Sequence, residues 1–150
     1  MKKDDNQVNV AKEDGIGELA TWEVYTKYQN RTTIGLDTIR EELGMGSWAA
    51  RVSHNDTFQG VFLQQHPGEG NRKHYHPDAW ENWIIMDGEW EWWIEGEGTK
   101  KVKTGDSVIV PPKTWHKITC VGDKPGVRYA MTKPDVVHIF ENENGDESNE

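Results

Sequence analysis

The sequence is poor in the features that mark secreted and membrane proteins. Its single cysteine, Cys120, excludes an internal disulfide. A lone thiol suits a reducing compartment, so we expect a cytoplasmic protein. No run of about 18 apolar residues is present to cross a membrane. The first fifteen residues, MKKDDNQVNVAKEDG, contain no apolar stretch of the kind that signal peptides carry, so we expect no secretory signal.

Positive charge is also scarce. Seventeen Lys and Arg stand against 26 Asp and Glu, which gives a formal net charge of -9. Such a surface repels phosphate backbones and anionic lipids, so neither nucleic acid nor a membrane is an expected partner. Composition further predicts a flexible arm over 1–15, one domain over 16–140 and a disordered acidic tail over 141–150.

Short apolar or alternating segments dominate the rest of the chain. Gly, Pro, Asp and Asn separate them, and many short strands at such spacing indicate an antiparallel sandwich or barrel. We therefore predict an all-β fold. The expected strands lie within 48–52, 58–64, 81–86, 89–95, 100–104, 107–111, 116–121, 127–132 and 136–140.

The region before Trp48 has a different pattern. Residues 36–43 are predicted to form a short helix, with Asp37 as its N-cap and Gly44 as its end. Residues 19–28 fit either a short helix or an irregular strand. The segment before Trp48 is also available to pair with the sheet edge of a second copy.

Three histidines and one glutamate have the spacing of metal ligands. His74 and His76 project to the same face of a strand because one residue separates them. Glu81 follows after a turn, and His116 begins a later strand. Imidazoles with one carboxylate suit a transition metal, so we expect one divalent ion (Fe, Mn, Co, Ni, Cu or Zn) per chain.

The segment that carries these residues resembles the cupin superfamily. Its first motif, G-x5-H-x-H-x4-E-x6-G, is met at Gly68, His74, His76, Glu81 and Gly88. The second motif is met at Gly105, Pro111 and His116, whereas Lys113 and Cys120 replace its Gly and Asn. The resemblance implies an antiparallel double-stranded β-helix, or jelly-roll barrel, with extra N-terminal strands. It also implies a homodimer, and Lys113 predicts a local change in loop geometry.

Residues beyond the four ligands are candidates for a substrate pocket. Trp83, Trp90 and Trp92 are candidate walls, although core packing or a buried dimer sheet also explains them. Arg51 and Gln64 are candidates for holding substrate, and Arg51, Gln64 and Tyr129 are weak catalytic candidates, although a structural role explains each of them as well. Arg128, beside Tyr129, lies on a strand that borders the cavity in cupins. The remaining histidines, His54, His66 and His138, are expected at the surface or in loops, and any of them could instead face the mouth of the barrel.

Three functions are compatible with this site. The favoured one is an oxygen-dependent, dioxygenase-type enzyme whose small organic substrate binds directly to the metal. The second is an isomerase, lyase or cyclase that uses the ion only as a Lewis acid. The third is a small-ligand-binding protein without catalysis. The fold alone does not choose among them.

Overall fold

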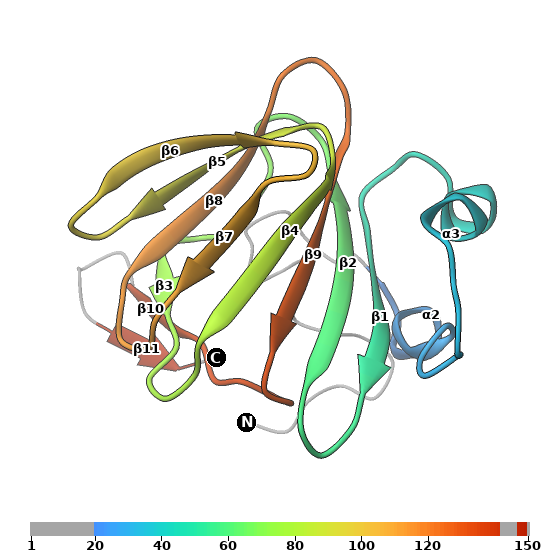
Figure 1. Ribbon diagram of the computed structural model, residues 1–150, viewed down its shortest axis with the longest axis horizontal. Helices are drawn as coiled ribbons and strands as arrows, with labels where there is room; N and C mark the ends of the chain where they lie inside the picture. Colours follow the sequence, from blue (N-terminus) through green and yellow to red (C-terminus); the bar gives the residue numbers. More distant parts are fainter. Residues whose placement is uncertain (1–19, 142–146, 150) are drawn as a thin grey trace.

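Two antiparallel sheets enclose the core of the molecule in the computed structural model, which describes residues 20–141 and 147–149 (Figure 1). The five-stranded sheet has the order β1 (Trp48–His54), β2 (Gln59–Gln65), β9 (Gly126–Thr132), β4 (Glu81–Asp87) and β7 (Ser107–Val110). The six-stranded sheet has the order β11 (Glu147–Asn149), β10 (Ile139–Glu141), β3 (His74–Tyr75), β8 (His116–Val121), β5 (Glu89–Ile94) and β6 (Gly98–Lys103). The predicted all-β jelly roll is confirmed.

Alternate residues of the central strands fill the space between the sheets. Trp83 on β4 and Trp90 and Trp92 on β5 are each at most 1% exposed. The rings of Trp83 and Trp92 lie 5.2 Å apart, across the two sheets. Gly88 joins β4 to β5 with a φ of +84°, and a Cβ there would lie 2.9 Å from the Cα of Gly126. The turn that carries the chain from β4 in one sheet to β5 in the other therefore requires glycine.

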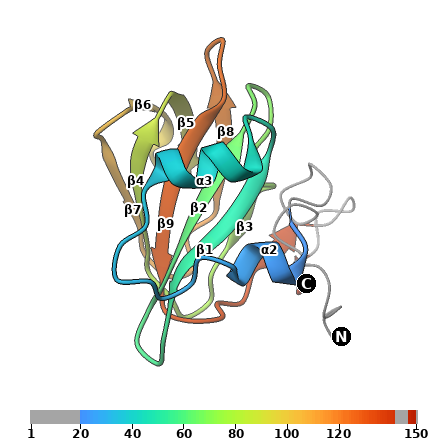
Figure 2. The same cartoon turned by 90° about the vertical axis from the view of Figure 1, so that its right-hand side faces the viewer.

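Helix α3 (Leu36–Leu43) covers the outer face of the five-stranded sheet (Figure 2). Its Ile39 is fully buried and belongs to a cluster with Trp48 and Phe62. The predicted bounds are confirmed, and Gly44 ends the helix with a φ of +83°. The prediction for Asp37 is wrong, because Gly35 is the N-cap and Asp37 lies within the first turn.

The ambiguous segment before α3 also forms a helix. Helix α2 (Trp22–Thr26) begins after Thr21, whose hydroxyl accepts a hydrogen bond from the backbone of Val24 at 3.2 Å. It packs beside β1. No strand occurs in the described part of the segment before Trp48, so the extra N-terminal strands of the barrel are β1 and β2. No helix among the described residues is long and apolar enough to cross a membrane.

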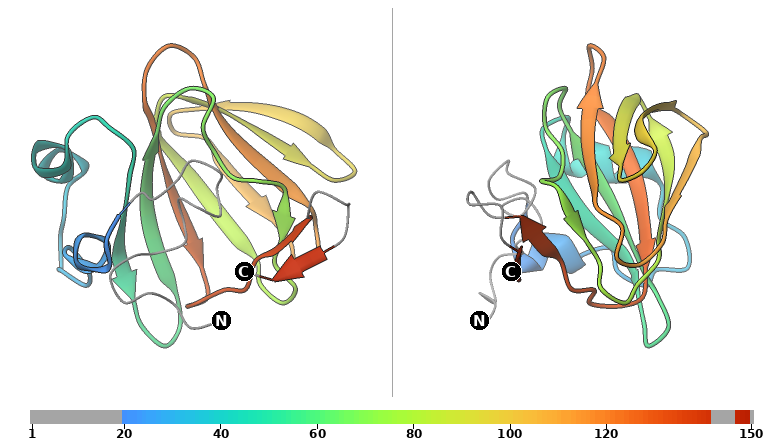
Figure 3. Two further views of the ribbon diagram at one scale, coloured as in Figure 1. Left: turned by 180° about the vertical axis from the view of Figure 1, so that it is seen from behind. Right: turned by 90° about the vertical axis from the view of Figure 1, so that its left-hand side faces the viewer.

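The C-terminal segment returns to the opening of the barrel. β10 pairs with β3 on one side and with β11 on the other (Figure 3). The strand predicted over 136–140 thus begins only at Ile139. Part of the tail expected to be disordered is strand, at Glu141 and 147–149. The expected flexible arm over 1–15 and residues 142–146 and 150 of the tail lie outside the described residues.

Candidate metal centre

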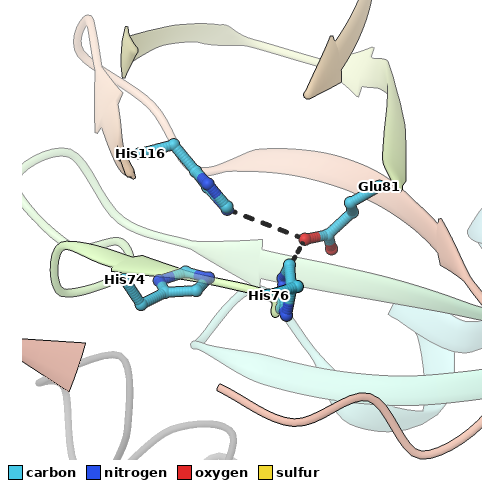
Figure 4. A group of neighbouring side chains, drawn as sticks. All are labelled: His74, His76, Glu81 and His116. Atoms are coloured by element: carbon cyan, nitrogen blue, oxygen red, sulfur yellow. Dashed lines mark hydrogen bonds and ion pairs between the residues drawn. The ribbon is translucent and has the colours of Figure 1, made fainter. Parts of the chain in front are cut away.

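The four expected ligands meet at one end of the barrel interior (Figure 4). His74 begins β3 and pairs across the sheet with His116, which begins β8. Glu81 begins β4 in the opposite sheet. One ligand atom from each of the four residues lies within 4.8 Å of the others. Residues 42 positions apart in sequence, His74 and His116, are thus brought together by strand pairing.

Backbone carbonyls fix the orientation of all three imidazoles. The Nδ1 atoms of His74 and His116 lie 2.7 and 3.0 Å from the carbonyl oxygens of Arg72 and Thr114. The Nδ1 of His76 lies 2.9 Å from the carbonyl oxygen of Val137. Since a carbonyl oxygen only accepts, each Nδ1 donates, so the Nε2 atoms of His74 and His116 keep their lone pairs when the rings are neutral, whereas the Nε2 of His76 is hydrogen-bonded to Glu81.

These Nε2 atoms point to a shared position. The Nε2 of His76 lies 2.7 Å from Glu81 Oε1, and that of His116 lies 3.8 Å from the same oxygen. The Nε2 atoms of His74 and His116 are buried and have no hydrogen-bond partner among the described residues. Converging buried lone pairs repel one another, whereas a divalent cation would satisfy all of them. The residues therefore fit a metal ion.

Electrostatics favour the protonation states that metal binding needs at His74 and Glu81, whereas at His76 burial is outweighed by the attraction of Glu81, which raises the pKa, so a metal ion must displace a proton there. Burial, followed by repulsion from His116 and other neighbouring imidazoles, holds the pKa of His74 well below its usual value of 6.5. Burial opposes ionisation of Glu81, but attraction to His76 and hydrogen bonds from the imidazoles outweigh it, so its pKa lies below the ordinary value. At neutral pH His74 is therefore neutral and Glu81 is ionised, as ligands must be.

A fifth functional group, His138, lies beside the centre. Its ring centroid is 4.9 Å from that of His74 and 4.7 Å from that of His76. His138 lies in a loop as expected, and of the two positions open to it, it takes the one at the mouth of the barrel, beside the metal ligands. No spacing signal could have found it, because β10 must first pair with β3 to bring it there. His66, by contrast, is exposed as expected.

A cavity of about 70 Å³ runs inward from the metal centre. Val136 and His138 line it where the C-terminal segment crosses the opening, and Glu81 lines it beside the ligands. Its deeper wall includes Asn71 and Arg128. The other lining residues are largely apolar and comprise Tyr25, Gln59, Val61, Leu63, Trp83, Ala130 and Thr132.

The three tryptophans proposed as pocket walls separate into two groups. Trp83 lines the cavity and lies 5.4 Å, between ring centroids, from His116. Trp90 and Trp92 are not among the residues that line it, and both are fully buried within the core cluster. The pocket interpretation is therefore supported for Trp83, whereas Trp90 and Trp92 serve core packing.

Arg51 does not reach the cavity. Its guanidinium lies 5.2 Å from the ring centroids of both Trp22 and Tyr25, and its Nε donates to Gln29 at 2.8 Å. Asp135 lies 3.7 Å away. These contacts hold the N-terminal segment against β1, so the structural explanation for Arg51 is the one the structure supports.

Gln64 and Tyr129 also point away from the cavity. Gln64 accepts a hydrogen bond from Arg40 at 2.7 Å and donates to the carbonyl oxygens of Gly44 and Gly46, so it fastens the end of α3 to β2. Tyr129 packs edge-on against Phe62 on the outer face. Its neighbour Arg128 faces inward and is the residue of this pair that lines the cavity.

Comparison with known proteins agrees with this architecture. The family model described as "Cupin domain" matches residues 61–131. No curated protein sequence matches the chain. The chain is similar to a Klebsiella pneumoniae protein with a double-stranded β-helix domain, at 20% identity and a TM-score of 0.60, over 81% of this chain and 91% of that one.

Two further solved structures have lower TM-scores. KdgF from Halomonas is 20% identical with a TM-score of 0.53, over 59% of this chain and 79% of that one. Oxalate decarboxylase from Bacillus subtilis is 22% identical with a TM-score of 0.52, over 60% of this chain but only 26% of that one. At these identities the similarity shows a shared fold.

Proposed function

The chain belongs to the cupin superfamily, and on that basis we propose that it is a metal-dependent enzyme acting on a small organic substrate. The observation that carries the proposal is the convergence of four ligand atoms within 4.8 Å, with the Nε2 atoms of His74 and His116 buried and unbonded among the described residues. His74, His76, Glu81 and His116 would hold one divalent transition-metal ion.

The cavity beside these ligands supports catalysis rather than a purely structural ion. A structural site is closed by its protein ligands, whereas a catalytic site leaves positions open. Four protein ligands on an ion that accepts six leave two, and Glu81 lines the cavity from which a substrate would reach them. The ion would polarise substrate oxygens and, if it is redox-capable, activate dioxygen.

The chain's own residues would orient the substrate and exclude water. Val61, Leu63, Trp83 and Ala130 form apolar walls, and the small volume leaves little room for solvent beside a ligand. His138 lies at the opening, where it can hydrogen-bond to a group entering the centre. The favoured reaction is an oxygen-dependent, dioxygenase-type oxidation, since neutral imidazoles with one carboxylate suit redox-capable ions such as iron and manganese.

A Lewis-acid reaction is the second candidate. Arg128 lines the cavity, and a fixed cation there can stabilise negative charge that develops on a substrate without any change in oxidation state. Isomerisation, lyase chemistry or cyclisation would use the ion and this charge together. Oxalate decarboxylase from Bacillus subtilis has Mn(II) centres, but this chain is similar to it in fold alone.

The test is metal analysis combined with oxygen uptake. Protein purified without chelator is analysed for bound metal and then assayed with 1,3-diketones, enols and catechols. Oxygen consumption coupled to product formation supports the oxidation. Turnover without oxygen consumption would replace it with the Lewis-acid reaction. Stoichiometric metal without turnover on any compound of the panel would favour a ligand-binding protein.

Assembly and location enter the proposal as well. We propose a homodimer, because β1 and the outer strands β6 and β7 leave sheet edges that a second copy can cover. A cytoplasmic location is proposed from the single cysteine, which suits a reducing compartment. Light scattering at micromolar concentration tests the homodimer, and a mass of 17.2 kDa, that of one chain, would contradict it.

A further inference from the structure

The metal centre is covered by a stretch of chain outside the region that matches the cupin domain. That match ends at residue 131, whereas residues 135–141, which we call the closing segment, cross the opening of the barrel and end in β10 (Figure 3). Val136 and His138 of this segment line the cavity. The closing segment therefore forms part of the site although it lies outside the matched domain.

One metal ligand takes its orientation from the closing segment. The Nδ1 of His76 lies 2.9 Å from the carbonyl oxygen of Val137, a contact between residues 61 positions apart. The corresponding carbonyls for His74 and His116 belong to residues only two positions earlier in the chain. Local chain geometry thus orients two of the imidazoles, whereas the orientation of His76 depends on the docking of a distant segment.

The short strand that begins with His74 also depends on the closing segment. β3 is two residues long, and β8 pairs with it through His74 and His116. β10 pairs with its other edge, where Ile139 lies opposite Tyr75 and Phe140 lies opposite His74. Since strands gain stability from having neighbours on both edges, β10 helps to hold His74 toward the other ligands.

Side chains anchor the closing segment at both ends. Phe140 is fully buried, and the guanidinium carbon of Arg72 lies 4.0 Å from the centre of its ring. At the other end, the exposed carboxylate of Asp135 lies 3.7 Å from Arg51, and the backbone N–H of Asp135 donates to Gln59 at 3.2 Å. A buried aromatic ring stabilises a contact more than an exposed ion pair does, so Phe140 is the main anchor.

From these contacts we propose that the closing segment is a positioning element of the metal centre, so that its docking and the binding of a metal ion stabilise each other. The inference rests on the proposed function of the four ligands. Val137 acts through the orientation of His76, and Phe140 acts by keeping β10 paired with β3. Such coupling is reciprocal: if undocking weakens metal binding, a bound metal must strengthen docking by the same factor.

The first experiment follows amide hydrogen exchange in the wild type with and without nickel, an ion that sites of imidazole and carboxylate bind tightly. Groups that orient metal ligands change metal affinity about 10- to 100-fold, so nickel should slow exchange at residues 137–141 by about the same factor. β6, at the other end of the same sheet, is the reference (Figure 1). Its exchange should change by less than about 2-fold, because segments open independently.

The second experiment measures the nickel affinity of variants by competition with a coloured chelator. Phe140→Ala removes the main anchor and should weaken the affinity by about 10- to 100-fold. Phe140→Leu keeps apolar volume at this position and should remain within about 3-fold of the wild type. Ile39→Ala is the matched control, because Ile39 is equally buried but lies in α3, away from the closing segment. It should lower stability and change nickel affinity by less than about 2-fold.

The results separate this inference from the proposed function. Equal slowing of exchange in the closing segment and in β6 would overturn the inference. A folded Phe140→Ala protein that binds nickel as tightly as the wild type would also overturn it. Both results require bound nickel, so the metal site itself would stand. A wild type that binds no nickel would overturn the inference and the proposed function together. The exchange comparison needs no variant, so it remains decisive if Phe140→Ala does not fold.

Discussion

Two polar clusters lie inside the same barrel, and they differ in what completes them. In the metal-ligand cluster, the Nε2 atoms of His74 and His116 are buried without a partner among the described residues, beside the bonded pair of His76 and Glu81. In the arginine cluster, Arg128 donates to the amide oxygens of Gln65 and Asn71. The first cluster contains acceptors that need a cation, whereas the second pairs its donors with acceptors of the chain itself.

This difference concerns stability as well as function. Buried polar groups are tolerated when they are hydrogen-bonded and are costly when they are not. The metal-ligand cluster should therefore destabilise the metal-free protein and stabilise the metal-bound form. The arginine cluster should stabilise the fold in both forms. The predictions below test this contrast, beginning with the largest expected effect.

Replacing a metal ligand should give the largest change. His116→Leu removes one Nε2 and should lower metal affinity by more than about 100-fold, since even outer partners of ligands change affinity 10- to 100-fold. Activity should fall with it. Equilibrium dialysis with elemental analysis measures the affinity, and His66→Leu, at an exposed histidine, is the control.

His116→Leu also tests whether the metal-ligand cluster destabilises the metal-free protein. There His116→Leu should unfold at the same or a higher denaturant concentration than the wild type, because it removes a buried lone pair and adds apolar volume. Marked destabilisation of the metal-free variant would show that the cluster is complete without an ion, contrary to our account.

Gln65→Leu should have the opposite behaviour. It removes the acceptor of a buried guanidinium and should destabilise the protein by about 2–3 kcal/mol, with or without metal. Denaturant unfolding measures the loss. A double variant with Arg128→Met serves as control, since removing both partners should restore much of the stability. If Gln65→Leu lowered the stability of the metal-bound form only, the arginine cluster would depend on the metal centre, contrary to our account.

Asp87 provides a reference for a cation with a carboxylate partner. Arg40 and Lys124 lie 2.9 and 3.0 Å from this carboxylate. Burial opposes its ionisation, but these bonds outweigh burial and lower its pKa below 3.8. The contribution to stability is therefore present above pH 3.8 and lost as the pH falls through the lower, folded-state value.

Asp87→Asn should thus destabilise the protein by about 1 kcal/mol at pH 7, because the groups are partly exposed. The difference from the wild type should shrink below pH 3.8. Urea unfolding at pH 7 and at pH 3 checks this. A difference that grows on acidification would mean that the ion pair does not account for the lowered pKa.

Lys113→Gly should give the smallest effect. Lys113 has a φ of +63°, the left-handed conformation that glycine adopts without penalty, and its backbone N–H donates to the carbonyl of His76 at 2.8 Å. The loop thus keeps a glycine-like conformation despite the lysine, unlike the expected change in geometry. Thermal unfolding should show a free energy of unfolding that is higher by up to about 1 kcal/mol in the variant. A lower value would show that Lys113 is not strained in this conformation.

The metal-ligand cluster could be predicted from sequence because its residues recur at fixed spacing. His74, His76, Glu81 and His116 stand at strand ends, where the first positions after turns are marked by Gly and Pro. The bounds of α3 were also predictable from the residues that flank it. These signals are local, so they need no knowledge of which strands pair.

The arginine cluster could not be predicted in the same way. β2 is buried on both faces, because α3 covers its outer side, so alternation does not distinguish inward from outward residues. Gln64 was therefore selected although the neighbouring Gln65 contacts Arg128. The apolar run around Arg51 indicates burial but not its cause, which is contact with α2 and not with the cavity. His138 lies beside the metal ligands because β10 pairs with β3, and this pairing could not be predicted from its position in the sequence.

The most direct test of the central claim is X-ray absorption spectroscopy on protein loaded with one equivalent of cobalt, nickel or iron. Our account predicts a single site per chain with imidazole scattering from three histidines and additional oxygen ligands, lost in His116→Leu. An ion surrounded by oxygen ligands alone, or a signal unchanged in that variant, would contradict a metal centre built from His74, His76, Glu81 and His116.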